Sequence, residues 1–221
     1  MMSDLENIGL SDGVFIEEIH SGELNVFLEN QTWFEDGFVR FQPSGQLLPR
    51  EFIKYEKTIK DLEVFESDIW ISSFPNCGTT WCQEMVWNIV NNLDFETAKS
   101  KSLDKRIPFL ELSALMGEKA FENFSAEDKS ENEAVVASIE YCKHLTSKPR
   151  ILKTHLHFEM LPDGVKEKKP KVIYIARNPR DVVVSFYNHW RVLAGFTGIK
   201  INLYSDWNFL KEKCRNFRSF L

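Results

Sequence analysis

A loop between a predicted strand and a predicted helix is the first place where this 221-residue chain could bind an anion. Residues 74–81 read Phe-Pro-Asn-Cys-Gly-Thr-Thr-Trp, and the apolar run 69–71 precedes them. Backbone N–H groups at a helix N-terminus point outward without partners, and the helix dipole favours negative charge there. The hydroxyls of Thr79 and Thr80 would add donors. The segment therefore predicts a phosphate- or sulfate-bearing ligand. The alternative is an ordinary strand-to-helix turn in which Gly78 serves only the tight geometry.

A second segment, Lys153-Thr154-His155, follows a short predicted strand at 150–154. A histidine there can act as a general base, since its unperturbed pKa lies near neutrality. Lys153 could offset negative charge on a transferring group. The alternative is a structural histidine. His157 raises the possibility of a metal pair, but the pattern offers no third ligand, so we predict no metal site.

A third segment begins with Arg177, directly after the apolar run 171–176. The planar fork of a guanidinium suits a bidentate phosphate contact. Ser185 lies on the helix that follows, which is expected to begin at Pro179, and could add a hydroxyl donor. The alternative places the arginines at the surface of a helix end, and for Arg180 we prefer that interpretation.

All three segments follow strands in an alternating strand–helix pattern, which predicts an α/β fold with a parallel sheet flanked by helices. Ligands of such sheets bind beyond the carboxyl ends of the strands, so the segments should meet at one edge. We expect strands at 68–73, 150–154 and 171–176, the last one buried on both faces. Helices are expected at 51–64, 79–91 and 179–193, with Gly195 ending the last. The apolar face of the second helix would comprise Trp81, Met85, Val86, Ile89 and Val90.

The remaining segments carry weaker signals. Pro43, Gly45 and Pro49 predict a loop over 43–50. Residues 94–135 are charged and only weakly periodic, which predicts short helices with long connections. Such a connection is either a lid or binding loop, or a surface insertion.

Composition excludes several classes. The net charge is -6, and the Lys166–Lys171 cluster reads as a solvated turn, so no nucleic-acid partner is predicted. Four cysteines lack metal-ligand spacing, and a disulfide framework is not expected. The thiol of Cys77, at a helix N-terminus, could have a lowered pKa; loop packing is the preferred reading. No signal peptide or membrane-spanning run is evident, so a cytoplasmic location is the default.

Together the three segments resemble the cytosolic sulfotransferase family over roughly residues 40–195. The family's phosphosulfate loop typically reads Tyr/Phe-Pro-Lys-Ser/Cys-Gly-Thr-Thr-Trp, and 74–81 is similar to it. Its Lys-Thr-His segment matches 153–155, and its Arg-Asn with a later serine matches Arg177, Asn178 and Ser185. The wording of the loop, with Gln-Glu-Met-Val-Trp at 83–87, looks like the insect branch.

The resemblance implies transfer of a sulfuryl group from 3'-phosphoadenylyl sulfate (PAPS) to a hydroxyl or amine of a small hydrophobic alcohol or phenol. It implies that His155 accepts the acceptor's proton, assisted by Lys153, that Arg177 and Ser185 hold the 3'-phosphate, and that no metal is needed. The aromatic N-terminal region and 94–135 would wall the acceptor pocket. The phosphosulfate end would be held by the loop residues Asn76, Cys77, Gly78, Thr79, Thr80 and Trp81.

Two departures from the family pattern affect what to expect. Asn76 stands where the family has a lysine that stabilises charge on the leaving phosphate. The family's late Arg-Lys-Gly segment has no counterpart in 199–221, which we cannot align. The resemblance then implies a single but truncated domain over 1–221, an incomplete sulfotransferase fold with a P-loop-like loop and exposed apolar surface. The competing function is a catalytically impaired relative that binds a nucleotide or small molecule. The oligomeric state is not predicted.

Overall fold

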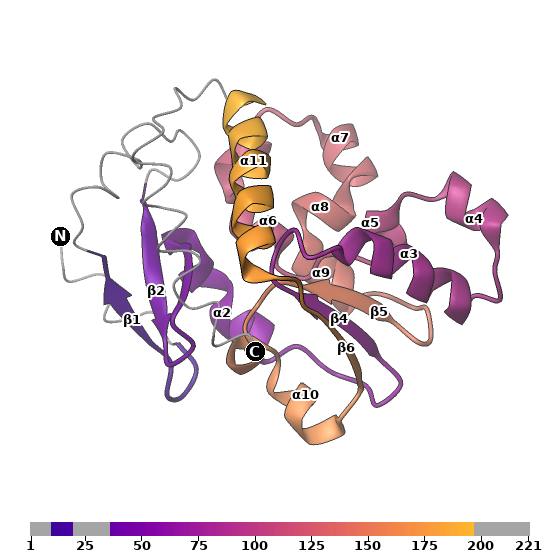
Figure 1. Ribbon diagram of the computed structural model, residues 1–221, viewed down its shortest axis with the longest axis horizontal. Coiled ribbons are helices and arrows are strands. Elements are labelled where there is room, and N and C mark those ends of the chain that lie inside the picture. Colours follow the sequence, from indigo (N-terminus) through magenta and orange to yellow (C-terminus); the bar gives the residue numbers. More distant parts are fainter. Residues whose placement is uncertain (1–9, 20–35, 197–221) are drawn as a thin grey trace.

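A computed structural model describes residues 10–19 and 36–196, and it contains two sheets that Figure 1 shows on opposite sides of the view. The antiparallel sheet has the order β1-β2-β3 and the parallel sheet the order β5-β4-β6. The strands are β1 Phe15–Glu18, β2 Phe38–Gln42, β3 Gln46–Pro49, β4 Ile69–Ser73, β5 Ile151–Thr154 and β6 Lys171–Ile175. The parallel sheet with helices around it confirms the predicted fold class.

Helices of 4 to 12 residues and one of 18 residues surround the sheets in the part of the chain that the structure describes. The α-helices are α2 Ile53–Lys60, α3 Thr79–Val90, α4 Phe95–Ser100, α5 Leu103–Arg106, α6 Leu112–Met116, α7 Ala126–Glu131, α8 Glu133–Val136, α9 Ser138–Lys143, α10 Asp163–Lys168 and α11 Pro179–Phe196. The 3-10 helices of the described residues are η1 Arg50–Phe52, η2 Glu118–Phe121 and η3 Phe158–Met160. The segment 94–135 is thus a series of short helices, as predicted, while α11 continues to Phe196 instead of ending near 193.

The parallel sheet forms around β4, which is buried along its whole length. Its side chains alternate between two cores because successive strand residues point to opposite faces. Trp70 packs in a core with residues of the antiparallel sheet such as Phe41. Ile69 and Ile71 face a second core that contains Val86 of α3. One strand therefore joins the two halves of the fold and presents its carboxyl end to the 74–81 loop.

The predicted loop at 43–50 was wrong in part, because residues 46–49 form strand β3. β3 pairs antiparallel with β2, with Phe41 opposite Gln46, and the turn between them contains Gly45 at φ 68°. The sequence from Gln46 to Pro49 does not alternate between apolar and polar residues, because the neighbours Leu47 and Leu48 are both apolar and both are buried. The proline and glycine signals correctly marked the turn but hid the strand that follows.

The predicted burial of β6 was wrong, and the predicted apolar face of α3 was wrong in part, because only Val86 and Val90 of that face pack in the second core. β6 is an edge strand among the described residues, and Val172 and Tyr174 are each 44% exposed instead of buried on both faces. On α3 the buried side chains are Thr79, Gln83, Val86 and Trp87. Trp81, Met85 and Ile89 of the predicted apolar face are exposed. The face of α3 that packs against the sheet is therefore rotated by one residue position from the face that hydropathy alone predicts.

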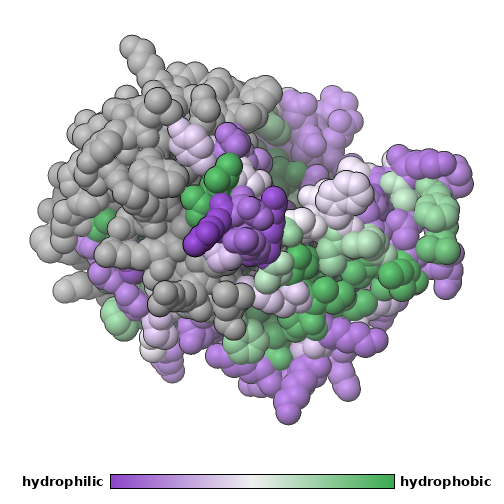
Figure 2. Space-filling view, viewed as in Figure 1, coloured by the Kyte–Doolittle hydropathy of each residue, from purple (hydrophilic) through white to green (hydrophobic). Residues whose placement is uncertain are grey.

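The exposed apolar side chains of α3 and β6 gather on one side of the molecule, where Figure 2 shows green surface. Exposed apolar surface on the sheet and helices was expected from the resemblance. Among the described residues no helix is long and apolar enough to cross a bilayer.

Candidate functional site

The loop after β4 has the backbone that an anion cradle requires. Asn76 lies in the left-handed region at φ 62° and Gly78, the residue that caps α3, at φ 96°. Asparagine and glycine are the residue types that adopt this conformation most readily. A Cβ added to Gly78 would meet no atom of the described residues within 4 Å beyond its own chain neighbours, so the space beside this glycine is open among them. No described side chain caps the first amides of α3.

The two threonines of the loop differ in environment. Thr79 is buried, and its hydroxyl lies 2.6 Å from the hydroxyl of Ser73 at the end of β4. Thr80 is exposed at the loop surface. Trp81 follows with 79% of its surface exposed. Thr80 and Trp81 are therefore open to a ligand, whereas Thr79 is already engaged with the strand.

His155 is joined to the same strand end. Its Nδ1 lies 2.7 Å from the carbonyl oxygen of Ser73, and the hydroxyl of Ser73 is 3.3 Å from the same nitrogen. Since a carbonyl only accepts, Nδ1 carries the proton and donates to it. Nε2 is left as the acceptor. Burial, followed by the charge of Lys153, lowers the pKa of His155 to about 3, so the ring is neutral at pH 7.

Lys153 and Phe109 stand beside the histidine. The Phe109 ring meets the His155 ring edge to face, with centroids 5.0 Å apart. The Lys153 ammonium lies 4.1 Å from the centroid of the same phenylalanine ring. Burial lowers the pKa of Lys153, while Glu111 and Asp104 oppose that shift. The Phe109 ring thus contacts both the Lys153 ammonium and the neutral imidazole of His155.

Two further side chains hold the backbone around His155. Glu111 is fully buried and accepts a bond from the amide of His155 at 2.6 Å and one from the hydroxyl of Thr154 at 3.0 Å. Gln46 of β3 donates its amide to the carbonyl oxygen of His155 at 3.0 Å. The side-chain oxygen of Gln46 accepts from the amide of His157 at 2.8 Å.

The third predicted segment reaches the loop from β6. Arg177 donates from Nη1 to the carbonyl oxygen of Asn76 at 3.3 Å. On α11, Val182 and Phe186 pack against Phe74 and Cys77, and Ser185 is partly buried on the same helix. Arg177 therefore lies on the loop's side of the sheet, and Ser185 lies on the helix whose residues Val182 and Phe186 pack on the loop.

The hypothesis of an acidic thiol at Cys77 is wrong. The side chain is buried, and this burial raises its pKa, more than Arg177 lowers it. Loop packing, the preferred reading, agrees with its place in the cluster with Phe74 and Val182.

The structure thus brings the three predicted segments together at one sheet edge, linked through Ser73 and Asn76. It adds four residues that sequence reasoning missed: Gln46, Ser73, Phe109 and Glu111. A signal for Glu111 was present, because it is a lone acid in the apolar run 107–112 and buried acids are rare without a partner. Gln46 carried no such signal, since its contact spans 109 positions.

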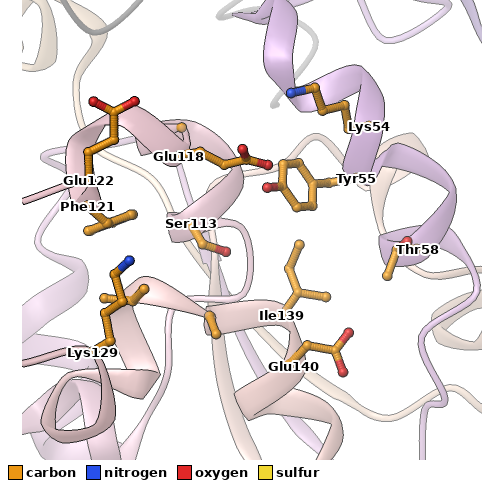
Figure 3. A pocket seen from close by; sticks show the side chains of 13 residues that line it. Lys54, Tyr55, Thr58, Ser113, Glu118, Phe121, Glu122, Lys129, Ile139 and Glu140 are labelled. Carbon is orange, nitrogen blue, oxygen red and sulfur yellow. The ribbon is translucent and has the colours of Figure 1, made fainter. Parts of the chain in front are cut away.

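A pocket of about 620 Å³ lies elsewhere, between α2, α6, η2 and the α8–α9 region. Figure 3 shows Tyr55, Glu118 and Ile139 pointing into it. None of the predicted site residues lines this pocket, so it is separate from the edge where the segments meet. No group of three or more possible metal ligands occurs among the described residues.

Comparison with known proteins identifies the family. The family model described as "Sulfotransferase domain" matches residues 66–218. The chain belongs to the sulfotransferase domain family. The match includes β4, β5, β6 and the site segments. It also extends to residue 218, so the expectation that 199–221 has no alignment with the family was wrong for most of that segment. Residues 199–221 lie outside the described residues, and a single domain over the whole chain stays a prediction.

Curated relatives of this sulfotransferase-domain chain include luciferin sulfotransferase of Photinus pyralis, 38% identical over 147 residues. Human sulfotransferase 1E1 is 34% identical over 151 residues. The alignments cover 66% and 68% of this chain but only 39% and 45% of the relatives. The chain thus matches less than half the length of these relatives.

Solved structures support the fold. A retinol dehydratase, in a complex with retinol and PAP, superposes with a TM-score of 0.70 at 24% identity. The superposition covers 91% of this chain and 62% of that one. A putative steroid sulphotransferase of Arabidopsis thaliana gives a TM-score of 0.50 at 23% identity.

Proposed function

We propose that this chain binds PAPS at the 74–81 loop and transfers its sulfuryl group to the hydroxyl of a small hydrophobic alcohol or phenol, or to an amine. The acceptor oxygen would attack sulfur, and the bond from sulfur to the bridging oxygen of the 5'-phosphate would break. The bridging oxygen would keep the electron pair and leave as part of 3'-phosphoadenosine 5'-phosphate (PAP). The proton of the acceptor would pass to Nε2 of His155.

The observation that carries the proposal is the bond between His155 Nδ1 and the Ser73 carbonyl at the end of β4. This bond turns Nε2, the nitrogen that can accept a proton, away from β4. The same strand leads into the 74–81 loop. The free lone pair of Nε2 beside the loop that would hold the electrophile meets the geometric requirement for a general base. The lowered pKa makes this imidazole a weaker base than the near-neutral histidine that the sequence predicted. Family membership supports sulfuryl as the transferred group, and the retinol-bound neighbour supports an apolar acceptor.

The nucleotide would be held from two sides. The amides at the start of α3 and the hydroxyl of Thr80 would bind the 5'-phosphosulfate end, because unpaired N–H groups and the helix dipole favour an anion. Arg177 and Ser185 would bind the 3'-phosphate. Lys153, with its ammonium on the Phe109 ring, would stabilise charge that develops during transfer. We place the reaction in the cytoplasm, the compartment that the family resemblance implies.

Binding and turnover can be tested separately on the purified chain. Titration calorimetry with PAP measures binding, and radiolabelled sulfuryl donor with a panel of phenols and alcohols measures transfer. His155→Asn should keep PAP affinity and lose transfer. The control His144→Asn changes an exposed histidine directly after α9 and should leave both unchanged. Absence of PAP binding in the unmodified chain would refute the proposal. PAP binding without any transfer would favour the impaired nucleotide-binding relative.

A further inference from the structure

Glu111 is a buried acid that the reaction above does not use. It precedes α6, has no exposed surface, and directs both carboxylate oxygens at the segment that follows β5. One oxygen accepts from the amide of His155 at 2.6 Å. The other accepts from the hydroxyl of Thr154 at 3.0 Å, and the Thr154 oxygen in turn accepts from the amide of Leu156 at 3.0 Å. The carboxylate of Glu111 thus holds Thr154 and His155 directly, and Leu156 through the hydroxyl of Thr154.

We propose that Glu111 is a positioning residue for His155, whose ionised carboxylate holds the backbone of residues 154–156 so that the imidazole keeps its bond to Ser73. The inference rests on the proposed function of His155 as general base. Glu111 itself touches neither substrate nor cofactor in this assignment, and it acts only through the segment that it binds.

The geometry explains why the carboxylate matters to the ring. Glu111 holds the amide of His155, and Gln46 holds its carbonyl oxygen at 3.0 Å. With both sides of the residue fixed, the imidazole has only its own torsions left, and the bond from Nδ1 to Ser73 at 2.7 Å sets these. Loss of the acceptor at the amide would leave a buried N–H unpaired, which costs roughly 1–3 kcal/mol and favours a shift of the segment.

The charge of Glu111 changes in the neutral range. Burial raises its pKa to about 7, while the bonds from His155 and Thr154 and the charge of Lys153 oppose the rise. Lys153 comes from β5, the Cys142 thiol faces Glu111 from α9, and Asp104 of α5 acts on Lys153. A protonated Glu111 carries a hydrogen on one oxygen, so that oxygen donates and can no longer receive a bond from Thr154 or His155 in the same geometry.

Nuclear magnetic resonance on the unmodified chain tests the coupling without any assay of activity. The ¹³Cδ signal of Glu111 follows its titration, and the ring ¹⁵N signals of His155 follow the tautomer. We expect Glu111 to titrate with a midpoint near 7 and the His155 signals to shift with the same midpoint, although His155 does not itself protonate there. A Glu111 titration to which His155 makes no response would overturn the proposal.

The variant Glu111→Gln, with Glu127→Gln on the exposed helix α7 as control, tests the same idea in the reaction. We expect PAP affinity within twofold of the unmodified chain, acceptor KM little changed, and kcat lower by about 10²-fold, as small misplacements of catalytic groups produce. The pH response of the His155 signals near 7 should disappear. A kcat equal to that of the control would contradict the proposal.

The two proposals can fail separately. If the unmodified chain does not bind PAP, the proposed function fails, whereas the coupling of the Glu111 and His155 signals still decides the positioning role. If PAP binds, transfer is observed and the signals are uncoupled, the positioning role fails and the proposed function stands. Thermal unfolding of Glu111→Gln is recorded alongside, and if that variant does not fold, the resonances of the unmodified chain carry the decision.

Discussion

The guanidinium of Arg150 donates to both carboxylate oxygens of Asp68, at 2.9 and 2.6 Å, with both side chains buried. Arg150 also donates to the carbonyl oxygens of Glu63 and Cys142, and its head lies 4.4 Å from the Phe65 ring centroid. The pair stands at the amino ends of β4 and β5, opposite the edge where the site segments meet. This ion pair therefore joins β4 and β5 at their amino ends and helps to fix their register.

Asp68→Ala should destabilise the chain by about 3–5 kcal/mol, because it leaves the buried charge of Arg150 without a partner. Urea unfolding at pH 7 measures the loss. The matched control is Asp61→Ala, which removes a carboxylate whose pair with Lys57 is exposed to solvent on both sides. Exposed pairs contribute little, so the control should unfold like the unmodified chain. Equal unfolding curves for both variants would show that the buried pair is dispensable.

Asn76→Lys should raise the rate of sulfuryl transfer by roughly 10²-fold, since one donor placed at developing charge is worth about that much. Asn76 has a buried side-chain nitrogen with no partner among the described residues, so its amide already points at a site that lacks an acceptor. Asn76→Gly keeps the φ 62° backbone and removes that donor, so it should transfer more slowly than the unmodified chain.

Steady-state assays with radiolabelled donor compare these two variants. Asn132→Lys, at the exposed end of α7, controls for an added positive charge. A rate for Asn76→Lys no higher than that of Asn132→Lys would mean that the residue at 76 does not limit transfer.

Stability should depend on pH through two buried groups with opposite signs. The pKa of His155 falls to about 3, so its contribution is present above its ordinary value of 6.5 and is lost as pH falls towards 3. The pKa of Glu111 rises to about 7, so its contribution is present below 4.5 and is lost as pH rises towards 7. Between pH 4.5 and 6.5 the two effects oppose one another, and the unmodified chain should change little from these groups.

His155→Gln removes one side of this balance. Its stability should rise relative to the unmodified chain by on the order of 1 kcal/mol per unit as pH falls from 6.5 to 4.5. Urea unfolding of both proteins at several pH values measures the difference. A difference that stays constant over this range would mean that His155 titrates normally in the folded chain.

Ile89→Lys should reduce self-association without loss of stability. Ile89 lies on the exposed apolar face of α3 with 72% of its surface in solvent, so a charge there meets water. Contiguous exposed apolar surface promotes association. Val86→Lys, three residues earlier on the buried face, should prevent folding because its ammonium would enter the second core. Light scattering and thermal unfolding distinguish the two; unchanged scattering for Ile89→Lys would place the association surface elsewhere.

The three parallel strands and the edge where the site segments meet were predictable because both depend on local signals, whereas the strand order β5-β4-β6 was not predicted. β4 and β5 are short apolar runs that end in polar motifs, and parallel strands necessarily bring such ends together. The start of α11 was likewise predictable, since Pro179 suits the first turn of a helix and the structure begins the helix there.

Burial could not be predicted, because it depends on partners that no local pattern encodes. Val172 and Tyr174 have the composition of a buried strand, yet β6 has a single neighbour in the described sheet. Trp81 and Ile89 have helical spacing with Met85, yet the sheet packs against Val86 and Trp87. The side chains that hold His155 were hidden for the same reason, since Gln46 and Glu111 reach it from distant parts of the sequence.

Gln46 hydrogen-bonds the backbone of residues 155 and 157, so the β2–β3 hairpin is joined directly to the segment that carries the proposed general base. A displacement of the hairpin tip at 43–45 would be transmitted to the imidazole without passing through the parallel sheet. An antibody fragment bound to that tip, or a spin label attached there, should therefore change the rate of the proposed transfer.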